Sequence, residues 1–423
     1  MRYGLIGASL SHSFSPQIHA AFGNKEYFLR ELSASELPLF MKERAFAAVN
    51  VTIPYKQAVM PLCDYISPEA QQIGSVNTVI NQNGLLCGYN TDYFGFAYLA
   101  AQAAVDFDGK KVLVLGSGGT SLAAQAAALD SGAREICVVS RSGADNYQNL
   151  HRHYDAEILI NTTPLGMYPQ SAQSPLDIAP FTHLDGVIDV IYNPLRTALL
   201  LQAKEKGIAY AGGLSMLVGQ AKKAHELFFK TTLDEDLIKK VVKQLEEQMA
   251  NVVLIGMPGS GKTTVGSLLA QKLGFSFVDV DQAVEQAAGM TVTQIFQTHG
   301  EPFFRHLEHQ TIKRICAQGG QVIATGGGSV LNSESRQYLS QNGLIIWLDR
   351  ETDKLDRCGR PLSGSTEELT LMYATRVPLY QKLSDIKVHV TDDAAETVRI
   401  IMEQRACCLM TIKKAAADTR LKE

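Results

Sequence analysis

The chain has no surplus of basic residues and no long apolar run. Among its 423 residues, Lys and Arg number 39 and Asp and Glu number 43, which gives a formal net charge of −4. Proteins that bind nucleic acid need a cationic surface to neutralise phosphates, so we predict no nucleic-acid partner. No apolar stretch approaches the roughly 18 residues of a membrane helix, and Met1–Gly7 begins directly on a strand pattern instead of a signal peptide. We therefore predict no membrane partner and a cytoplasmic location.

The chain also lacks any patterned use of cysteine. Its seven cysteines are scattered, without a Cys-x-x-Cys pair or zinc-site spacing, so neither a disulfide framework nor a structural metal is indicated. Hydrophobic residues make up 46% of the chain and charged residues 19%, as in globular proteins. At about 150 residues per domain, the length predicts about three domains.

Strand and helix patterns alternate along the chain, which is typical of parallel sheets covered by helices. The strand candidates are Tyr3–Ile6, Ala47–Val51, Thr78–Ile80, Lys110–Leu115, Glu135–Ser140, Ile158–Asn161 and Gly186–Ile191. An Ala-rich helix is expected at Leu122–Asp130, and an amphipathic helix at Thr232–Met249 ends the first half. A new α/β unit begins at Asn251 with almost no linker, and the polar stretch Arg405–Glu423 is predicted to be a tail.

Residues 256–263 read Gly-Met-Pro-Gly-Ser-Gly-Lys-Thr, a complete phosphate-binding loop. A strand pattern (Asn251–Ile255) precedes it and a helix pattern (Val265–Leu273) follows, as this motif requires; the alternative is a chance Gly-rich turn. The glycines allow backbone N–H groups to surround phosphate oxygens. Lys262 is predicted to reach the terminal phosphates and Thr263 to bind Mg²⁺. The ATP-binding residues expected are Gly259, Ser260, Gly261, Lys262, Thr263 and Thr264.

A second Gly-rich turn, Gly116-x-Gly118-Gly119, lies between a strand and a helix pattern and predicts a dinucleotide site. It departs from the usual fingerprint because Ser121 stands where the third glycine is expected. The next strand ends in a cation between hydroxyls, Ser140-Arg141-Ser142, which suits the 2′-phosphate of NADP; Arg141 could instead be an ordinary surface arginine. The expected contacts to NADP(H) are Gly116, Ser117, Gly118, Gly119, Thr120 and Arg141.

Five further clusters occur in order along the first 249 residues. They are Ser-His-Ser-Phe-Ser-Pro at 11–16, Asn-Val-Thr-Ile-Pro-Tyr-Lys at 50–56, Gly-Ser-Val-Asn-Thr at 74–78, Tyr-Asn-Thr-Asp at 89–92 and Gly-Leu-Ser-Met-Leu-Val-Gly-Gln at 213–220. Together they closely resemble shikimate dehydrogenase. Hydride transfer to a carbonyl leaves an alkoxide that must be protonated. Lys56 can supply that proton and Asp92 can orient it, although the two could form a plain surface ion pair.

The resemblance implies further site residues. Ser13 and Ser15 would bind the substrate carboxylate, although both could instead be helix caps before Pro16. The remaining residues implied are Thr52, Asn77 and Gln220 for the substrate hydroxyls, Tyr192 near the carboxylate, Gly213 at the cofactor and the loop Asn161–Met167 along the cofactor cleft.

Two carboxylates stand two residues apart in Phe-Val-Asp279-Val-Asp281. On a strand, this spacing directs both to one face, where Asp279 would bind Mg²⁺ and Asp281 would orient an acceptor hydroxyl. Solvation of a strand end is the alternative. The runs Gly300–Glu308, Ala324–Gly328, Arg360–Leu362 and Arg376–Tyr380 follow in order, and over residues 251–404 the chain looks like shikimate kinase.

That resemblance implies an acidic acceptor. Arg305 and Arg376 would bind the shikimate carboxylate through guanidinium forks, and Gly327 and Gly328 would approach the substrate closely. The resemblance also implies roles for two lid residues: Arg360 at the transferred phosphoryl, unless it is a solvated loop cation, and Arg357 at the adenine. The run from Arg357 to Arg360 is shorter than the family's usual lid, so we expect a tighter lid.

The predicted fold class is α/β, with three parts. An N-terminal α/β substrate lobe (1–95 and 210–249) and a Rossmann NADP-binding lobe (96–209) form a dehydrogenase at 1–249. A P-loop kinase domain with a central parallel sheet follows at 250–405, then a tail at 406–423. The resemblances imply NADPH-dependent reduction of 3-dehydroshikimate to shikimate, then phosphorylation of shikimate by ATP, in aromatic amino-acid and chorismate biosynthesis. The alternatives are a quinate/shikimate dehydrogenase that uses NAD, joined to a non-catalytic nucleotide-binding regulator or to a kinase of another small acidic acceptor.

Overall fold

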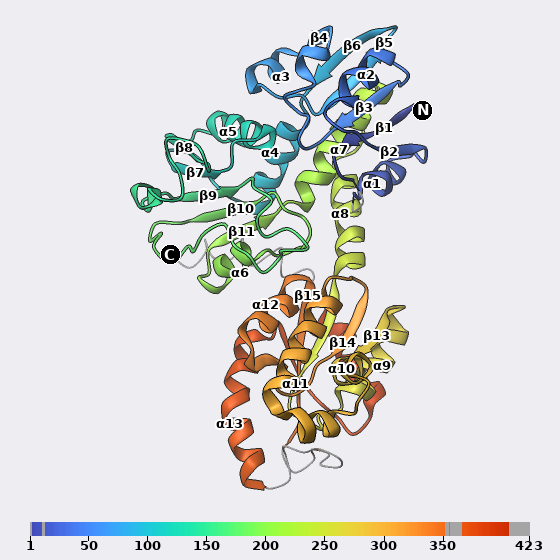
Figure 1. Ribbon diagram of the computed structural model, residues 1–423, viewed down its shortest axis with the longest axis vertical. Coiled ribbons are helices and arrows are strands. Elements are labelled where there is room, and N and C mark those ends of the chain that lie inside the picture. Colours follow the sequence, from blue (N-terminus) through green and yellow to red (C-terminus); the bar gives the residue numbers. More distant parts are fainter. Residues whose placement is uncertain (1, 11–12, 352–354, 356–365, 406–423) are drawn as a thin grey trace. The chain divides into compact units, whose positions relative to one another are not determined.

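The computed structural model describes residues 2–10, 13–351, 355 and 366–405. These residues form three sheets and divide into two compact units. Unit 1 comprises Met1–Met167, Ser174–Asn193 and Gln202–Leu245; unit 2 comprises Glu246–Glu423 together with the short segments Tyr168–Gln173 and Pro194–Leu201. In Figure 1, unit 1 runs from blue to green and unit 2 from yellow to red. The predicted α/β class is confirmed.

The first sheet of unit 1 is mixed. Its order is β2 (Tyr27–Glu31), β1 (Tyr3–Gly7), β3 (Ala48–Val51), β5 (Thr78–Gln82), β6 (Leu85–Tyr89) and β4 (Tyr65–Ile66). The β1, β2 and β3 strands are parallel, whereas β5 pairs antiparallel with both β3 and β6. All four residues of β3 are buried, as expected for a strand covered on both faces. The sheet is packed with α1 (Ser15–Ala21), α2 (Glu36–Glu43) and α3 (Pro68–Ile73) in the same lobe (Figure 1).

The second sheet of unit 1 is fully parallel. Its order is β11 (Ala209–Gly212), β10 (Gly186–Asp189), β9 (Ile158–Asn161), β7 (Lys111–Leu115) and β8 (Glu135–Val139). The chain passes from β7 to β8 on one side and then returns to β9 on the other, so β7 is the switch point. Ligands of such sheets bind at the carboxyl ends of strands beside a switch point. Here that position is the Gly-rich turn between β7 and α5 (Gly119–Asp130).

Three long helices follow. The α4 (Asp92–Ala103) and α7 (Leu214–Phe229) helices lie in unit 1, and α8 (Asp236–Met249) begins in unit 1 and ends in unit 2. The α4 helix packs against both α5 and α7, so it connects the lobe of the first sheet with the lobe of the second. The N-terminus of α4, which carries Asp92, therefore lies where the two lobes meet.

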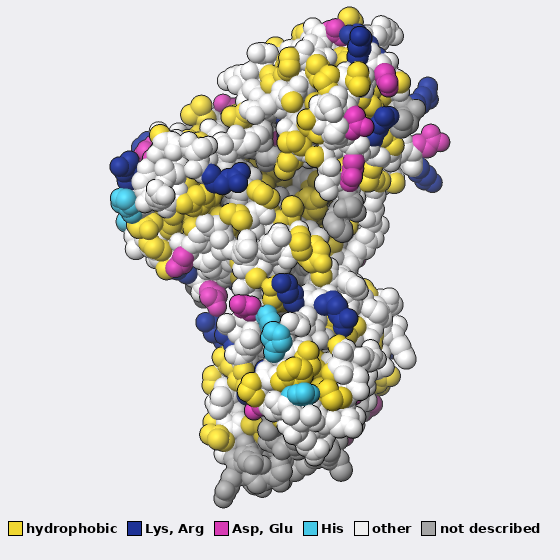
Figure 2. Space-filling view, viewed as in Figure 1, with side chains coloured by type: hydrophobic (Ala, Val, Ile, Leu, Met, Phe, Trp, Pro, Cys, Tyr) yellow, Lys and Arg dark blue, Asp and Glu magenta, His cyan; other side chains and the backbone are white. Residues whose placement is uncertain are grey.

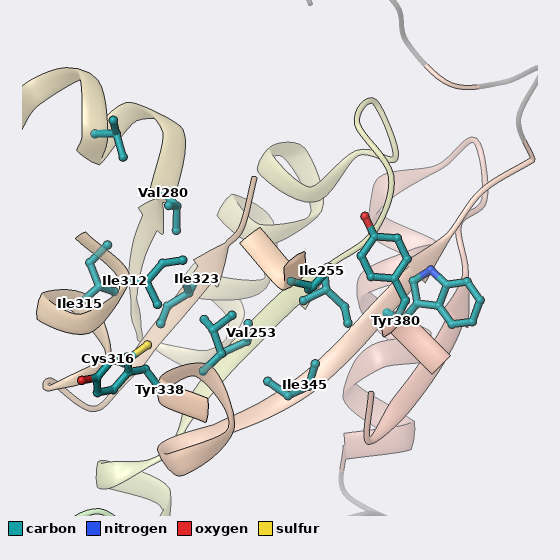
Figure 3. Packing of buried hydrophobic residues seen from close by; sticks show 14 of the residues in the cluster. Val253, Ile255, Val280, Ile312, Ile315, Cys316, Ile323, Tyr338, Ile345 and Tyr380 are labelled. Carbon is teal, nitrogen blue, oxygen red and sulfur yellow. The ribbon is translucent and has the colours of Figure 1, made fainter. Parts of the chain in front are cut away.

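Unit 2 is built on a fully parallel sheet of five strands. The order is β13 (Ser276–Asp279), β14 (Gln321–Ala324), β12 (Asn251–Ile255), β15 (Gly343–Asp349) and β16 (Ile386–His389). The helices are α9 (Lys262–Leu273), α10 (Val280–Ala288), α11 (Val292–Cys316), α12 (Ser333–Asn342), α13 (Thr366–Leu383) and a helix over residues 394–405. Figure 3 shows part of the core, in which Val253, Ile323 and Ile345 of three strands pack with Ile312 and Ile315 of α11.

One local prediction in this unit is wrong. The strand expected to carry both Asp279 and Asp281 ends at Asp279, which is the N-cap of α10. The Asp279 side chain accepts hydrogen bonds from the backbone N–H groups of Asp281 and Gln282, and this bond pattern starts the helix. Asp281 therefore lies in the first turn of α10, not on a strand face.

Charges of both signs are interspersed on the face drawn in Figure 2, and neither sign gathers into one patch. Among the described residues, none of the helices is both long and apolar enough to cross a lipid bilayer.

Candidate active sites

The first site centres on a pair formed by Lys56 and Asp92. Lys56 lies in the loop after β3, and Asp92 is the first residue of α4. The Lys56 Nζ to Asp92 Oδ2 distance is 2.5 Å, and the two side chains are 12% and 6% exposed. The pair is therefore enclosed and is not a surface ion pair. The second oxygen of the Asp92 carboxylate accepts a hydrogen bond from the Asn77 side chain.

Lys56 also contacts the dinucleotide turn. Its Nζ donates to Thr120 Oγ1 at 2.9 Å, and a Cβ placed on Gly119 would lie 2.9 Å from Lys56 Cβ. A larger residue than glycine would therefore push Lys56 away. A Cβ on Gly118 would meet nothing within 4 Å, which leaves room for a ligand beside the first turn of α5. The structure thus brings the predicted proton donor next to the predicted cofactor turn.

A buried side chain stabilises the dinucleotide turn. The Ser121 hydroxyl, at the position where a third glycine was expected, is buried and donates to the Gly116 carbonyl at 2.7 Å. Gly116 has a φ of +104°, a conformation that favours glycine. Ser117 lies in this turn, and Arg141 is exposed directly after β8. Gly213 is the N-cap of α7. A Cβ on Gly213 would lie 1.9 Å from the Val190 carbonyl oxygen.

The predicted carboxylate-binding serines lie at the start of α1. Ser13 Oγ donates to Ser15 Oγ at 3.1 Å, and Ser15 is 6% exposed. Phe14, not a serine, is the N-cap of α1, and no side chain caps the helix. The Ser13 hydroxyl nevertheless accepts from the backbone N–H of Ser15, the first residue of α1, at 3.3 Å. Phe14 also makes an edge-on contact with Tyr192, with ring centroids 5.9 Å apart, which brings the predicted Tyr192 to the same end of α1.

The remaining predicted substrate residues lie near Asp92. Asn77 donates from Nδ2 to Asp92 Oδ1 at 2.9 Å, and Thr91 Oγ1 lies 3.5 Å from Gln220 Oε1. Thr52 is half-buried and directly follows β3, four residues before Lys56. The Thr91 contacts were not foreseen from the sequence, although the Tyr-Asn-Thr-Asp cluster contains this residue.

The second site begins at the phosphate-binding loop after β12. Gly259 and Gly261 have φ values of +80° and +89°, which lets successive N–H groups turn toward one volume. Lys262 Nζ donates to the carbonyls of Gly256 and Met257 at 3.0 and 2.9 Å. The hydroxyl of Ser260 is fully buried and has no partner among the residues that the structure describes. A buried hydroxyl without a partner fits a loop whose missing partner is a phosphate oxygen.

The candidate Mg²⁺ ligands are in contact with each other. Thr263 Oγ1 donates to Asp279 Oδ2 at 2.7 Å. Thr264 follows in the first turn of α9. Mg²⁺ is usually bound by one or two protein oxygens together with substrate phosphates and water, and this pair beside a phosphate loop fits that pattern. Burial, Glu308 and Asp279 together raise the pKa of the partly buried Asp281 to about 6.

The triple glycine after β14 brings the rest of this site together. A Cβ on Gly326 would lie 2.8 Å from Asp281 Oδ1, and one on Gly328 would lie 2.5 Å from Arg305 Nη2. A Cβ on Gly327 would lie 3.1 Å from Arg376 Nη1. Glycine at these positions therefore permits the close approach of one carboxylate and two guanidinium groups.

Glu308 is a site residue to which the sequence argument gave no role, although it ends the run Gly300–Glu308. It is 3% exposed, pairs with Arg305 Nη1 at 2.8 Å and accepts a hydrogen bond from Ser329 Oγ at 2.5 Å. Its charge balances Arg305 in the absence of an acidic ligand. The predicted lid residues Arg357 and Arg360 lie outside the described residues.

Comparisons with known proteins identify the families that the chain resembles. A family model of the shikimate dehydrogenase substrate binding domain matches residues 5–79, and a model of shikimate kinase matches residues 258–406. The shikimate dehydrogenase (NADP(+)) of Clostridium beijerinckii is 37% identical over 265 aligned residues, which cover 58% of this chain and 98% of that protein. The chain belongs to the shikimate dehydrogenase family and also carries a shikimate kinase domain.

Solved structures support the first assignment. Shikimate dehydrogenase 1 from Peptoclostridium difficile has a TM-score of 0.54 at 38% identity, over 58% of this chain and 98% of that chain. The shikimate 5-dehydrogenase of Thermus thermophilus, solved with NADP(H) and shikimate, has a TM-score of 0.52 at 32% identity, over 58% and 99%. Both family resemblances inferred from the motifs are thus confirmed. The names of the relatives also favour NADP as the dinucleotide, and the kinase family implies ATP.

Proposed function

We propose that this chain is a bifunctional enzyme that reduces 3-dehydroshikimate to shikimate with NADPH and then phosphorylates the 3-hydroxyl of shikimate with ATP. The enclosed Lys56–Asp92 pair beside the cofactor turn is the observation that carries the first activity. The domain limits that we propose are 1–249, with lobes at 1–95 plus 210–249 and 96–209, then 250–405 and a tail at 406–423. The cytoplasmic location stays a prediction.

In the reduction, NADPH supplies the hydride that adds to the substrate carbonyl. We propose that Lys56 donates a proton from Nζ to the oxygen on which negative charge develops. Asp92 holds this ammonium in place before the reaction, because its carboxylate lies 2.5 Å from Lys56 Nζ. Ser13, Ser15 and Tyr192 would hold the substrate carboxylate at the start of α1, while Thr52 and Gln220 would contact its hydroxyls.

In the phosphorylation, ATP with Mg²⁺ supplies the phosphoryl group. We propose that Thr263 and Asp279 hold the metal, that Lys262 neutralises the terminal phosphates, and that Asp281 orients the acceptor hydroxyl and accepts its proton. A pKa raised to about 6 keeps Asp281 largely ionised at neutral pH while it remains a stronger base than an ordinary aspartate. Arg305, Arg376 and the N–H groups near Gly327 and Gly328 would bind the substrate carboxylate.

A coupled assay tests both activities at once. Purified chain is mixed with 3-dehydroshikimate, NADPH, Mg²⁺ and ATP, and NADPH absorbance is followed together with ADP release. We expect NADPH consumption first and ADP release only after shikimate forms. If ADP does not appear even when shikimate is added directly, the kinase half of the proposal is wrong. If NADH replaces NADPH at an equal or greater rate, the NAD-dependent quinate/shikimate alternative is favoured.

A further inference from the structure

A buried network of hydrogen-bonded polar side chains adjoins the Lys56–Asp92 pair. The reduction proposed above gives no role to most of its members. Its members have exposed fractions of 8% (Tyr27), 5% (Asn50), 0% (Thr78), 2% (Asn77) and 1% (Thr91). Three strands and the start of α4 contribute these residues. Burying so many polar groups is costly unless all are hydrogen-bonded, and a fully bonded network holds its members in one geometry.

A backbone N–H group fixes the orientation of Asn77. Thr91 N can only donate, and it lies 2.7 Å from the Asn77 atom Oδ1, so that atom must be the amide oxygen. The amide nitrogen therefore faces Asp92 Oδ1 at 2.9 Å and Thr91 Oγ1 at 3.0 Å. Both protons of the Asn77 amide are thus used within the protein, and one of them is donated to the partner of Lys56.

A backbone carbonyl fixes the orientation of Asn50 in the same way. The Asn77 carbonyl can only accept, and it lies 3.4 Å from the nitrogen of the Asn50 amide. That nitrogen also donates to Thr78 Oγ1 at 3.0 Å, and Thr78 in turn donates to Asn77 Oδ1 at 3.1 Å. The Asn50 oxygen consequently faces Tyr27, whose hydroxyl donates to it at 2.7 Å.

We infer that Tyr27, Asn50 and Thr78 are positioning residues for the reduction. Their hydrogen bonds lock the Asn77 amide, which holds the Asp92 carboxylate, which in turn holds the Lys56 ammonium. This inference rests on the proposed role of Lys56 as proton donor. Burial raises the pKa of Tyr27, which keeps its hydroxyl protonated as a donor, and its ring stacks on His19 with centroids 4.0 Å apart.

Thr78→Val removes the central hydroxyl at nearly constant shape. We expect kcat for reduction to fall about ten- to hundredfold with KM within about twofold, because a misplaced catalytic group slows the chemical step more than it weakens binding. Thr78→Ser, which keeps the hydroxyl, should restore kcat.

A pair of tyrosine variants separates positioning from stability. Tyr27→Phe removes the hydroxyl at the far end of this network. Tyr55→Phe removes a similarly buried hydroxyl that does not belong to the network and donates to the Leu32 carbonyl at 2.6 Å. Both leave one buried acceptor without its donor, so both should lower stability alike. Only Tyr27→Phe should lower kcat for reduction, and the kinase activity of the same chain serves as a check of integrity.

The outcomes distinguish this inference from the proposed function. If Lys56→Ala collapses reduction but Thr78→Val and Tyr27→Phe keep the wild-type kcat, the positioning role is overturned and the function stands. If the two tyrosine variants lose activity equally and in step with stability, the role is only structural. If Lys56→Ala itself reduces 3-dehydroshikimate at a near-normal rate, the proposed proton donor is wrong.

Discussion

At the scale of single residues, His19 connects the hydrogen-bonded network that begins at Tyr27 with the stability of unit 1. It is 1% exposed, stacks between Tyr27 and Phe228, and donates a hydrogen bond to the Asn50 side-chain oxygen. Burial, helped by the neighbouring His225, lowers the pKa of His19 to about 3. Burial also lowers the pKa of His225. Neutral imidazole is therefore the form that fits this core.

The depressed pKa predicts acid sensitivity of unit 1. An unfolded His19 takes up a proton near pH 6.5, whereas the folded one stays neutral down to about pH 3. Stability from this residue is thus complete above about pH 6.5 and is lost as the pH falls toward 3. Between pH 7.5 and pH 5, the free energy of unfolding should fall by about 1–2 kcal/mol less in His19→Phe than in the wild type. The phenylalanine keeps a stacking ring.

The single tryptophan makes this measurement selective. Trp347 lies in β15 of unit 2, so its fluorescence follows the unfolding of unit 2, while circular dichroism follows both units. Denaturant unfolding is measured at both pH values. The difference between wild type and His19→Phe should appear only in the transition of unit 1, which changes circular dichroism but not fluorescence. Equal pH dependence of that phase in the two proteins would contradict the prediction.

At the scale of elements, the local position of each Gly-rich segment could be read from the sequence, whereas one strand could not. Both Gly-rich turns and the triple glycine directly follow strands, as their contiguous residues suggest. The position of Asp281 was predicted wrongly, because the capping bond of Asp279 starts a helix where residue spacing alone suggests a strand. The network from Tyr27 to Asn77 could not be predicted, since its members meet only after four strands have paired.

The triple glycine yields a prediction for the kinase site. Gly328 has a φ of −100°, so alanine meets no backbone strain there, but its Cβ would lie 2.5 Å from the Arg305 guanidinium. That flexible end can move, and the domain should stay folded with Arg305 displaced from its site. We expect Gly328→Ala to raise KM for shikimate about tenfold, as for the loss of about 1.4 kcal/mol of binding.

Gly274→Ala is the matched control within the same domain. Gly274 ends α9 with a φ of +68°, and a Cβ there would meet nothing within 4 Å. Alanine should therefore cost about 1 kcal/mol of stability through backbone strain and leave KM unchanged. A normal KM in Gly328→Ala, measured beside this control, would show that Arg305 does not bind the acceptor.

At the scale of the whole molecule, the residues proposed for each activity lie in one unit. Unit 1, with two sheets, holds Lys56, Asp92 and the dinucleotide turn, and unit 2, with one sheet, holds the phosphate loop, Arg305 and Arg376. No residue proposed for one reaction belongs to the unit of the other. The prediction is that Lys56→Ala stops reduction and leaves phosphorylation intact, and that Lys262→Ala does the converse.

Mixing the two variants tests whether the joined activities exchange shikimate through solution. With each active site at its wild-type concentration, a mixture of Lys56→Ala and Lys262→Ala chains should form shikimate 3-phosphate at the wild-type steady rate and after the same lag. The lag reflects accumulation of free shikimate to the level that the kinase requires. A clearly shorter lag in wild type would mean that shikimate passes between sites of one chain, and the two units would then have to act together even though each holds a complete set of proposed site residues.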